Sequence, residues 1–248
     1  MISAIVVSHG HAAELETSLP ALEPQVDELV LIANIPESLP PGREGIENPH
    51  PLSYAANLNH GIAESHGELV LVNNPDAVPE PGAVATLAAF MAEHPRAGIA
   101  GPRLLNPDGT EQNSRRRFPT VGGTLVRRTP LRRAFPPQER QRAHYNLDEH
   151  PTEPVEADWM LGGSLLLRRE MLDELGGYDA GFRMYGEEID LCYRAAKAGW
   201  GRWYVPSAVV THRWDAFTDK RFLTRRTLWH WRSILRYARK HPETIVGR

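Results

Sequence analysis

Short apolar runs alternate with stretches of helical periodicity over the first hundred residues. Runs rich in Val, Ile and Leu predict strands at residues 2–8, 28–33, 68–73 and 97–100. Apolar residues at helical spacing predict helices over residues 9–22, 53–65 and 81–93, the last with a proline in its first turn. This alternation predicts an α/β fold with a mostly parallel central sheet flanked by helices, and ligands at the carboxyl ends of its strands.

The pattern changes after residue 101. An Asn-Pro-Asp-Gly turn at 106–109 precedes residues 115–154, which are rich in arginine and proline and have few periodic apolar positions. We expect a long functional loop there. Beyond it, extended chain is expected at 155–168, helices at 170–175 and 186–198, strands at 201–205 and 208–211, and a basic amphipathic helix at 221–241.

Length and composition narrow the class of protein. The 248 residues are 41% hydrophobic and 24% charged, which is typical of a globular protein and excludes a disordered, fibrous or disulfide-scaffold chain. The single cysteine, Cys192, allows no internal disulfide and fits a reducing compartment. No apolar run approaches the roughly 20 residues that span a bilayer, and the N-terminus carries no basic leader. We therefore expect a cytoplasmic protein.

The net charge of −3 conceals a strong asymmetry. Residues 1–102 carry a charge of −11 and residues 143–212 one of −6, whereas residues 103–142 and 213–248 carry +7 each. Two basic stretches on an acidic body indicate anionic partners, such as a nucleoside diphosphate or an anionic lipid surface. Nucleic acid is not expected, because the sequence contains no recognised binding module.

The basic helix at 221–241 is amphipathic. Leu228, Trp231, Leu235 and Ala238 share one face, with arginines mostly elsewhere. Aromatic residues beside arginines suit an anionic membrane surface, which would make the protein peripheral at the inner face of the plasma membrane. The alternative is that the apolar face packs on the domain or on a second copy of the chain, as a homodimer.

The first candidate site residues follow the strand at 68–73. Asn74 and Asp76 lie just beyond its end. A carboxylate there would face the ligand crevice and could hold Mg²⁺ or Mn²⁺, which take oxygen ligands and would neutralise a diphosphate. The alternative is an Asn-Pro-Asp turn with a solvated carboxylate.

A second group lies at the start of the helix predicted at 186–198. Glu187, Glu188 and Asp190 place three carboxylates within four residues, directly after Gly186. Acids at a helix N-terminus are favoured by the helix dipole, so capping alone is one explanation. Because three carboxylates repel one another, the other explanation is a general base positioned to take a substrate proton.

Two further groups are candidates. Asp158 and Trp159, with Gly163 close behind, could form a platform for a sugar ring, or the tryptophan could be buried beside a glycine turn. His212 comes just after the strand at 208–211 and could bind a metal or a phosphate, although a lone histidine is more often structural.

Seven motifs follow one another along the chain: IVVS at 5–8, SYAANLNHGI at 53–62, VNNPDA at 72–77, DGTEQNSRRRFP at 108–119, EADWMLGGSLLLRR at 156–169, GGYDAGFRMYGEEIDLCYRAAKAGW at 176–200 and VPSAVVTH at 205–212. In this order they resemble family 2 glycosyltransferases with the GT-A fold, and most of all the bacterial rhamnosyltransferase-like branch. The fourth motif matches a family pattern D-G-x-x-Q-x-S-x-R-x-F-P. The resemblance covers about residues 2–240.

The resemblance implies a role for each candidate. Asp76 would bind the metal and the diphosphate together with His212, and Asn74 stands where other branches carry a first aspartate. Glu188 occupies the place of the usual catalytic base, and Asp190 that of a second catalytic acid. The residues expected to contact substrate are Ser8, Asn34, Asn59, Asn74, Asp158, Trp159, Gly163, Glu187, and Arg115 and Arg117 over the donor phosphates.

The implied activity is inverting transfer of a sugar, with rhamnose expected, from a nucleotide-diphosphate donor to a cell-surface polysaccharide or glycolipid. Mg²⁺ or Mn²⁺ is the expected cofactor. Residues 1–215 would form one GT-A domain, with 103–154 as a basic, loop-rich insertion. Residues 216–248 would form the basic amphipathic C-terminal helix.

Three positions depart from the family pattern. Ala33 replaces the aspartate that helps to hold the nucleobase and ribose, Ser53-Tyr54 replaces glycine-phenylalanine, and Glu188 replaces an aspartate that is one methylene shorter. Displacing a catalytic group by about 1 Å can cost about 100-fold in rate. The alternative function is therefore a catalytically degenerate sugar or nucleotide-sugar binding protein of the same fold.

Overall fold

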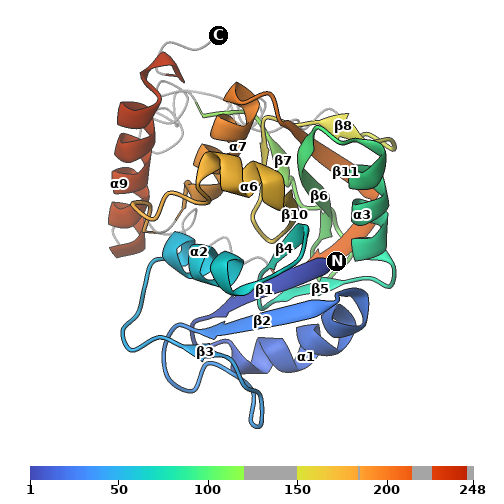
Figure 1. Cartoon of the computed structure of the whole chain (residues 1–248), viewed down its shortest axis with the longest axis vertical. Coiled ribbons are helices and arrows are strands. Elements are labelled where there is room, and N and C mark those ends of the chain that lie inside the picture. Colours follow the sequence, from blue (N-terminus) through green and yellow to red (C-terminus); the bar gives the residue numbers. More distant parts are fainter. Residues whose placement is uncertain (120–149, 184, 214–224, 245–248) are drawn as a thin grey trace.

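A computed structural model of the chain describes residues 1–119, 150–183, 185–213 and 225–244. These residues form three layers, with helices on both faces of one sheet (Figure 1). The strands of that sheet lie in the order β3 (Ile46–Glu47), β2 (Glu28–Ala33), β1 (Ile2–Ser8), β4 (Leu69–Asn73), β10 (Ser164–Arg168), β6 (Ala97–Leu105), β11 (Gly201–His212) and β5 (Ala77–Pro79), and β8 (Val155–Glu156) pairs with β11. A separate ribbon pairs β7 (Arg115–Arg116) with β9 (Trp159–Met160).

The sheet is mostly parallel, as expected, and β10, β5 and β8 run opposite to the other six strands. Strands β3, β2, β1 and β4 are parallel, as the alternation of elements predicts. Strand β10 lies antiparallel to both β4 and β6, and β11 is again parallel to β6. The first residue of β10, Ser164, pairs with Asn73 at the carboxyl end of β4. Because β10 starts at that end of the sheet, it must run in the opposite direction.

Alternate residues of the central strands pack against different helix layers, because side chains of a strand point to opposite faces. Ile5 and Val7 pack with α2 (Tyr54–Glu64), α6 (Arg169–Leu175) and α7 (Glu187–Lys197). Ala4 and Val6 pack with α1 (Ala12–Leu22), which η1 (Glu23–Gln25) follows, and with α3 (Ala83–Glu93). The carboxyl ends of β1, β2 and β4 lie at one edge of the sheet.

Two strands are longer than predicted. β6 continues to Leu105, beyond the predicted end at residue 100. The strands predicted at 201–205 and 208–211 are one strand, β11, with a register shift between Val205 and Val209. Pro206 lies in that interval and has no N–H to give to the ladder, so a bulge lets the pairing with β6 resume. Most of the predicted basic insertion lies outside the described residues.

The C-terminal helix α9 (Arg225–Lys240), followed by η3 (Pro242–Thr244), does not bury the predicted apolar face. Among its described side chains Ser233 and Tyr237 are buried, as is His241 just after the helix, whereas Leu235 is 52% exposed. The domain presents carboxylates toward this helix, and these attract its polar side chains, as described below. The side chain of Leu228 lies outside the described residues. Of the helices in the described ranges, none has the length and apolar character needed to cross a bilayer.

Candidate active site

The ends of β1 and β2 bring Ser8 and Asn34 together. The Asn34 N–H donates to the Ser8 carbonyl at 2.8 Å, and the Ser8 hydroxyl donates to the Ser38 carbonyl at 2.6 Å. The Asn34 side chain accepts from the Leu52 N–H at 2.8 Å and from the Asn48 amide at 2.9 Å. Both predicted substrate residues are buried at the carboxyl ends of β1 and β2, where they hold the loop at 35–53.

Asn74, Asp76 and His212 meet at the ends of β4 and β11. His212 Nε2 is 3.5 Å from Asp76 Oδ1 and 3.3 Å from Asn74 Nδ2. Gly163 packs against the imidazole so closely that a Cβ there would lie 3.2 Å from ring atoms. Its carbonyl also accepts the Asn74 N–H at 2.9 Å. Four residues predicted from three separate motifs thus form one group.

Asp76 and His212 fit a site for a hard divalent cation. Adjacent ligands of a Mg²⁺ ion lie about 3 Å apart, close to the observed 3.5 Å between Asp76 Oδ1 and His212 Nε2. In the described part of the chain, no three His, Cys, Asp or Glu side chains are grouped to hold a metal ion. The remaining positions would fall to phosphate oxygens and water, which Mg²⁺ commonly keeps.

Glu187 and Glu188 form a buried acid pair at the start of α7. Gly186 precedes them with φ of 103°, a left-handed conformation that glycine adopts without steric cost. Burial raises the pKa of Glu187, and the charge of Glu188 raises it further. Burial also raises the pKa of Glu188. The pair therefore titrates above the ordinary carboxyl range, which suits a general base.

Arg116 is the cation that faces this pair. Although burial raises the pKa of Glu188, the charge of Arg116 acts to lower it. Arg116 is only 7% exposed, and its guanidinium lies 5.1 Å from the centroid of the Trp159 ring. The sequence prediction names Arg115 and Arg117 and misses this residue. Side chains alternate along an extended chain, so Arg116 points away from Arg115 and Arg117. The arginine of the family pattern also falls on position 116, and either observation could have identified Arg116.

Tyr54 lies near both the acid pair and the candidate metal site of Asp76 and His212. Its hydroxyl donates to Asn74 Oδ1 at 3.0 Å. Burial raises the pKa of Tyr54, and the charges of Glu187, Glu188 and Asp76 raise it further. The hydroxyl therefore stays protonated, and the three carboxylates that act on it lie around one tyrosine. The sequence prediction mentions Tyr54 only as a departure from the family pattern.

Trp159 does not offer a platform for a sugar. It is 3% exposed, its Nε1–H donates to the Arg117 carbonyl at 2.8 Å, and Arg116 covers its ring. The alternative of a buried tryptophan therefore holds. Asp158 accepts the Phe118 N–H at 2.9 Å, and Arg115 pairs with Met160 across the ribbon of β7 and β9. These contacts hold the start of the basic segment beside α7.

Asn59 lies apart from the other predicted residues. Its Nδ2 donates to the Tyr178 carbonyl at 2.7 Å, and its Oδ1 accepts the Tyr178 N–H at 2.8 Å. A Cβ at Gly177 would lie 2.6 Å from Asn59 Oδ1, so this contact requires glycine. Asn59 therefore holds the turn at 176–178 against α2, and its predicted contact with substrate does not fit this placement.

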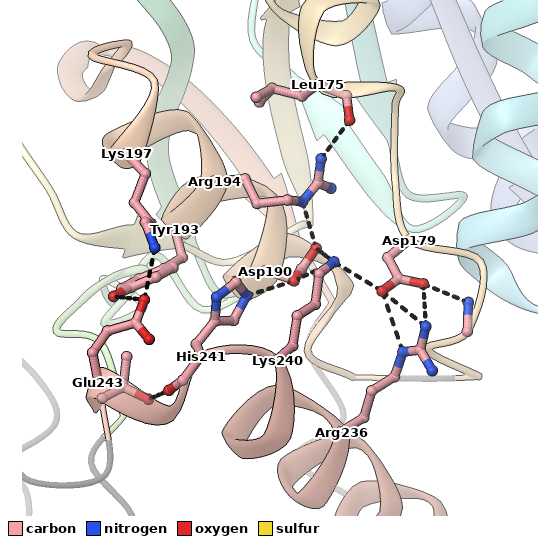
Figure 2. A network of polar contacts seen from close by, with 12 residues as sticks. Leu175, Asp179, Asp190, Tyr193, Arg194, Lys197, Arg236, Lys240, His241 and Glu243 are labelled. Carbon is pink, nitrogen blue, oxygen red and sulfur yellow. Dashed lines mark hydrogen bonds and ion pairs between the residues drawn. The ribbon is translucent and has the colours of Figure 1, made fainter.

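Asp190 lies among basic side chains, as Figure 2 shows. Its carboxylate is fully buried and lies 2.7 Å from Arg194 Nε, 2.8 Å from Lys240 Nζ and 2.8 Å from His241 Nε2. Three basic side chains occupy its oxygens, so the predicted catalytic role does not fit. Its place is that of a structural ion pair.

Asp179 makes a second contact with α9 (Figure 2). Arg236 Nη2 lies 2.7 Å and Lys240 Nζ 2.8 Å from its oxygens. Although burial opposes it, these hydrogen bonds hold the pKa of Asp179 well below its usual range. Lys240 thus contacts both aspartates, and these ion pairs hold α9 against the segment that precedes the acid pair.

Burial raises the pKa of the Cys192 thiol to about 12, so the thiol is not a nucleophile.

The fold and these groups agree with the GT-A fold of glycosyltransferases. Residues 26–184 match the family model described as glycosyl transferase family 2, and the chain belongs to that family. Acid residues at the carboxyl ends of the strands and at the start of α7 agree with this assignment.

Curated relatives include two rhamnosyltransferases. N-acetylglucosaminyl-diphospho-decaprenol L-rhamnosyltransferase of Mycobacterium tuberculosis is 36% identical over 175 residues, which are 65% of this chain and 55% of that protein. Rhamnosyltransferase WbbL of Escherichia coli is 37% identical over 84 residues, 34% of this chain and 31% of that protein. The chain therefore matches about half or less of the length of these relatives.

Solved structures share the fold at low identity. GalNAc-T7 with UDP, GalNAc and Mn²⁺ aligns with a TM-score of 0.64 and 19% identity, over 88% of this chain and 44% of that chain. Mannosyltransferase PcManGT from Pyrobaculum calidifontis, in complex with GDP-Man and Mn²⁺, aligns with a TM-score of 0.57 and 16% identity, over 87% of this chain and 57% of that chain. These likenesses support the GT-A fold.

Proposed function

We propose that the chain catalyses inverting transfer of a sugar from a nucleotide-diphosphate donor to an acceptor hydroxyl. The position of Tyr54 carries the proposal, because its hydroxyl bonds Asn74 while the charges of Asp76, Glu187 and Glu188 act on it. A site for the leaving diphosphate and a candidate base are therefore proposed to lie near this one side chain.

Glu188 is the proposed base. It takes the proton of the acceptor hydroxyl while that oxygen bonds the anomeric carbon, and the bond from this carbon to the diphosphate breaks on the opposite face. The raised pKa of Glu188 suits this task, because a base is most effective when its pKa lies near the working pH. Glu187, whose pKa is raised by burial and by Glu188, would remain protonated beside it.

Asp76 and His212 would hold Mg²⁺ or Mn²⁺. When bound, the ion supplies positive charge that stabilises the leaving diphosphate. The solved structures of GalNAc-T7 and PcManGT hold Mn²⁺ together with a nucleotide or a nucleotide sugar, which supports this choice. Arg115 and Arg117 at the start of the basic segment are proposed to meet the donor phosphates.

The names of the two relatives support rhamnose as the sugar, and we propose dTDP-rhamnose as the donor. The acceptor is proposed to be a lipid-linked glycan, as the name of the Mycobacterium tuberculosis relative indicates for that enzyme. At the position of the family aspartate, Ala33 offers no carboxylate to the base and ribose.

A lipid-linked acceptor fits a peripheral membrane position for the outer side of α9. Leu235 is 52% exposed there, and Arg232 and Arg239 are exposed beside it. Apolar and basic side chains together favour an anionic bilayer surface. Flotation with vesicles that contain phosphatidylglycerol tests this: Leu235→Glu should reduce the bound fraction, and equal binding of both proteins would refute it.

A panel of nucleotide sugars with Mn²⁺ and a lipid-linked acceptor extract tests the enzyme proposal, with nucleotide binding and nucleotide release measured together. Release that is lost in Asp76→Ala and Glu188→Ala supports transfer at this site. Saturable binding without release would instead support the degenerate binding protein. Release that persists unchanged in both variants would refute the site.

A further inference from the structure

Gln112 lies buried behind His212, on the side away from Asp76. It is 3% exposed, and His212 is 5% exposed. Gln112 Oε1 and Nε2 both contact His212: Oε1 lies 3.1 Å from the ring Nδ1, and Nε2 lies 2.6 Å from the main-chain oxygen. One side-chain amide therefore contacts both the ring and the main chain of His212, and it can determine which ring nitrogen carries the proton.

The orientation of the Gln112 amide follows from its partners. The main-chain carbonyl of His212 can only accept a hydrogen bond, so the Gln112 atom at 2.6 Å must be the nitrogen. The same nitrogen donates to Asn106 Oδ1 at 2.9 Å. The remaining atom, Oε1, is an acceptor, and it faces His212 Nδ1 at 3.1 Å.

Asn106 confirms this orientation independently. The Asp108 carboxylate accepts from the Thr110 hydroxyl at 2.6 Å. That hydroxyl has then given its proton and accepts from Asn106 Nδ2 at 2.8 Å. Asn106 therefore turns its oxygen toward Gln112, as the donation from Gln112 requires. The donor and acceptor of each hydrogen bond in this series follow from the Asp108 carboxylate, which can only accept.

We propose that Gln112 is a positioning residue, which holds the proton of His212 on Nδ1 and leaves the lone pair of Nε2 facing Asp76 and Asn74. The Asn74 amide nitrogen, 3.3 Å from Nε2, is a donor that matches such a lone pair. A neutral imidazole nitrogen is what a divalent cation binds, and the partner of the other nitrogen selects it. The inference rests on the proposed function only in assuming that His212 binds a metal ion.

The tautomer of His212 is measurable on the metal-free protein without substrate. Long-range ¹H–¹⁵N NMR at pH 8 should show the His212 proton on Nδ1 in the wild type. In Gln112→Met the spectrum should shift toward the Nε2–H form or a mixture. Asn113→Met, which replaces a side-chain amide by methionine at an exposed neighbouring position, should leave the wild-type spectrum. A wild-type Nε2–H tautomer, or Nδ1–H retained in Gln112→Met, would overturn the proposal.

Binding of Mn²⁺ alone, followed by electron paramagnetic resonance, gives a second readout. Loss of a residue that orients a metal-binding histidine weakens affinity by about 10- to 100-fold, and we expect that loss in Gln112→Met but not in Asn113→Met. An altered tautomer with unchanged Mn²⁺ affinity would overturn the role of His212 toward the ion. Absence of sugar transfer with both readouts as expected would count against the proposed reaction alone.

Discussion

His241 Nε2 lies 2.8 Å from Asp190 Oδ1, so the end of the C-terminal helix reaches a fully buried carboxylate in the first turn of α7. Arg194 and Lys240 complete the same ion group. A segment fifty residues further along the chain thus supports the turn that carries Glu187 and Glu188. The contact explains why α9 turns its polar side inward.

Asp190→Asn should destabilise the protein. Removing one partner of a buried ion pair leaves the other charges uncompensated, at a cost of about 3 kcal/mol. Urea unfolding measures the change in free energy. Glu243→Gln is the control, because its ion pair with Lys197 is exposed to solvent and should contribute much less to stability. Equal losses in both variants would contradict the buried network.

Stability should also depend on pH through Asp179. Its pKa is lower in the folded protein than its usual value, so its contribution is present above about pH 4 and is lost as the pH falls below that value. Arg236 is partly exposed, so we expect Asp179→Asn to lose only about 1 kcal/mol at pH 7. At pH 3 the free energies of unfolding of the wild type and of Asp179→Asn should differ less than at pH 7. An equal difference at both pH values would refute the role of Asp179.

Arg116→Met should move the acidic limb of the pH–rate profile to higher pH. The charge of Arg116 lowers the pKa of Glu188, and a base must be ionised to act, so loss of the charge delays activity as pH rises. We expect a shift of about 1 pH unit in kcat/KM. Arg117→Met is the control, since the exposed Arg117 should alter KM for the donor without moving the limb.

Gly163→Ala should displace His212. A Cβ at this position would lie 3.2 Å from the imidazole, so the ring must shift by a few tenths of an ångström. We expect about tenfold weaker Mn²⁺ binding, because small errors in ligand position weaken such sites. Gly162→Ala is the control, since its Cβ would meet no described atom within 4 Å. Identical Mn²⁺ affinity in both variants would show that His212 is not held by this contact.

The strand ends of this fold are accessible to sequence reasoning. Asp76 and His212 follow apolar runs that can only be buried strands, and such runs end at a common edge in an α/β sheet. The sequence could therefore predict that Asp76 and His212 lie near each other, but not that 3.5 Å separates them. The glutamates at the start of α7 were singled out on a different ground, because three carboxylates directly after a glycine repel one another.

Contacts between distant segments were not accessible in the same way. Trp159 is covered by Arg116, and the side chain that covers an aromatic ring depends on how two short strands pair. The buried side of α9 is chosen by Asp179 and Asp190, which lie far away in the sequence. The hydrophobic pattern of that helix points to Leu235 instead, and Leu235 is exposed.

The rate of sugar transfer by Glu188→Gln tests the central claim most directly. With the nucleotide-sugar donor that binds the wild type, Mn²⁺ and a lipid-linked acceptor, kcat should fall by about 10²- to 10⁴-fold, the usual worth of a general base. The affinity for the nucleotide sugar should stay unchanged, because Glu188 acts on the acceptor. A kcat close to that of the wild type would contradict the account.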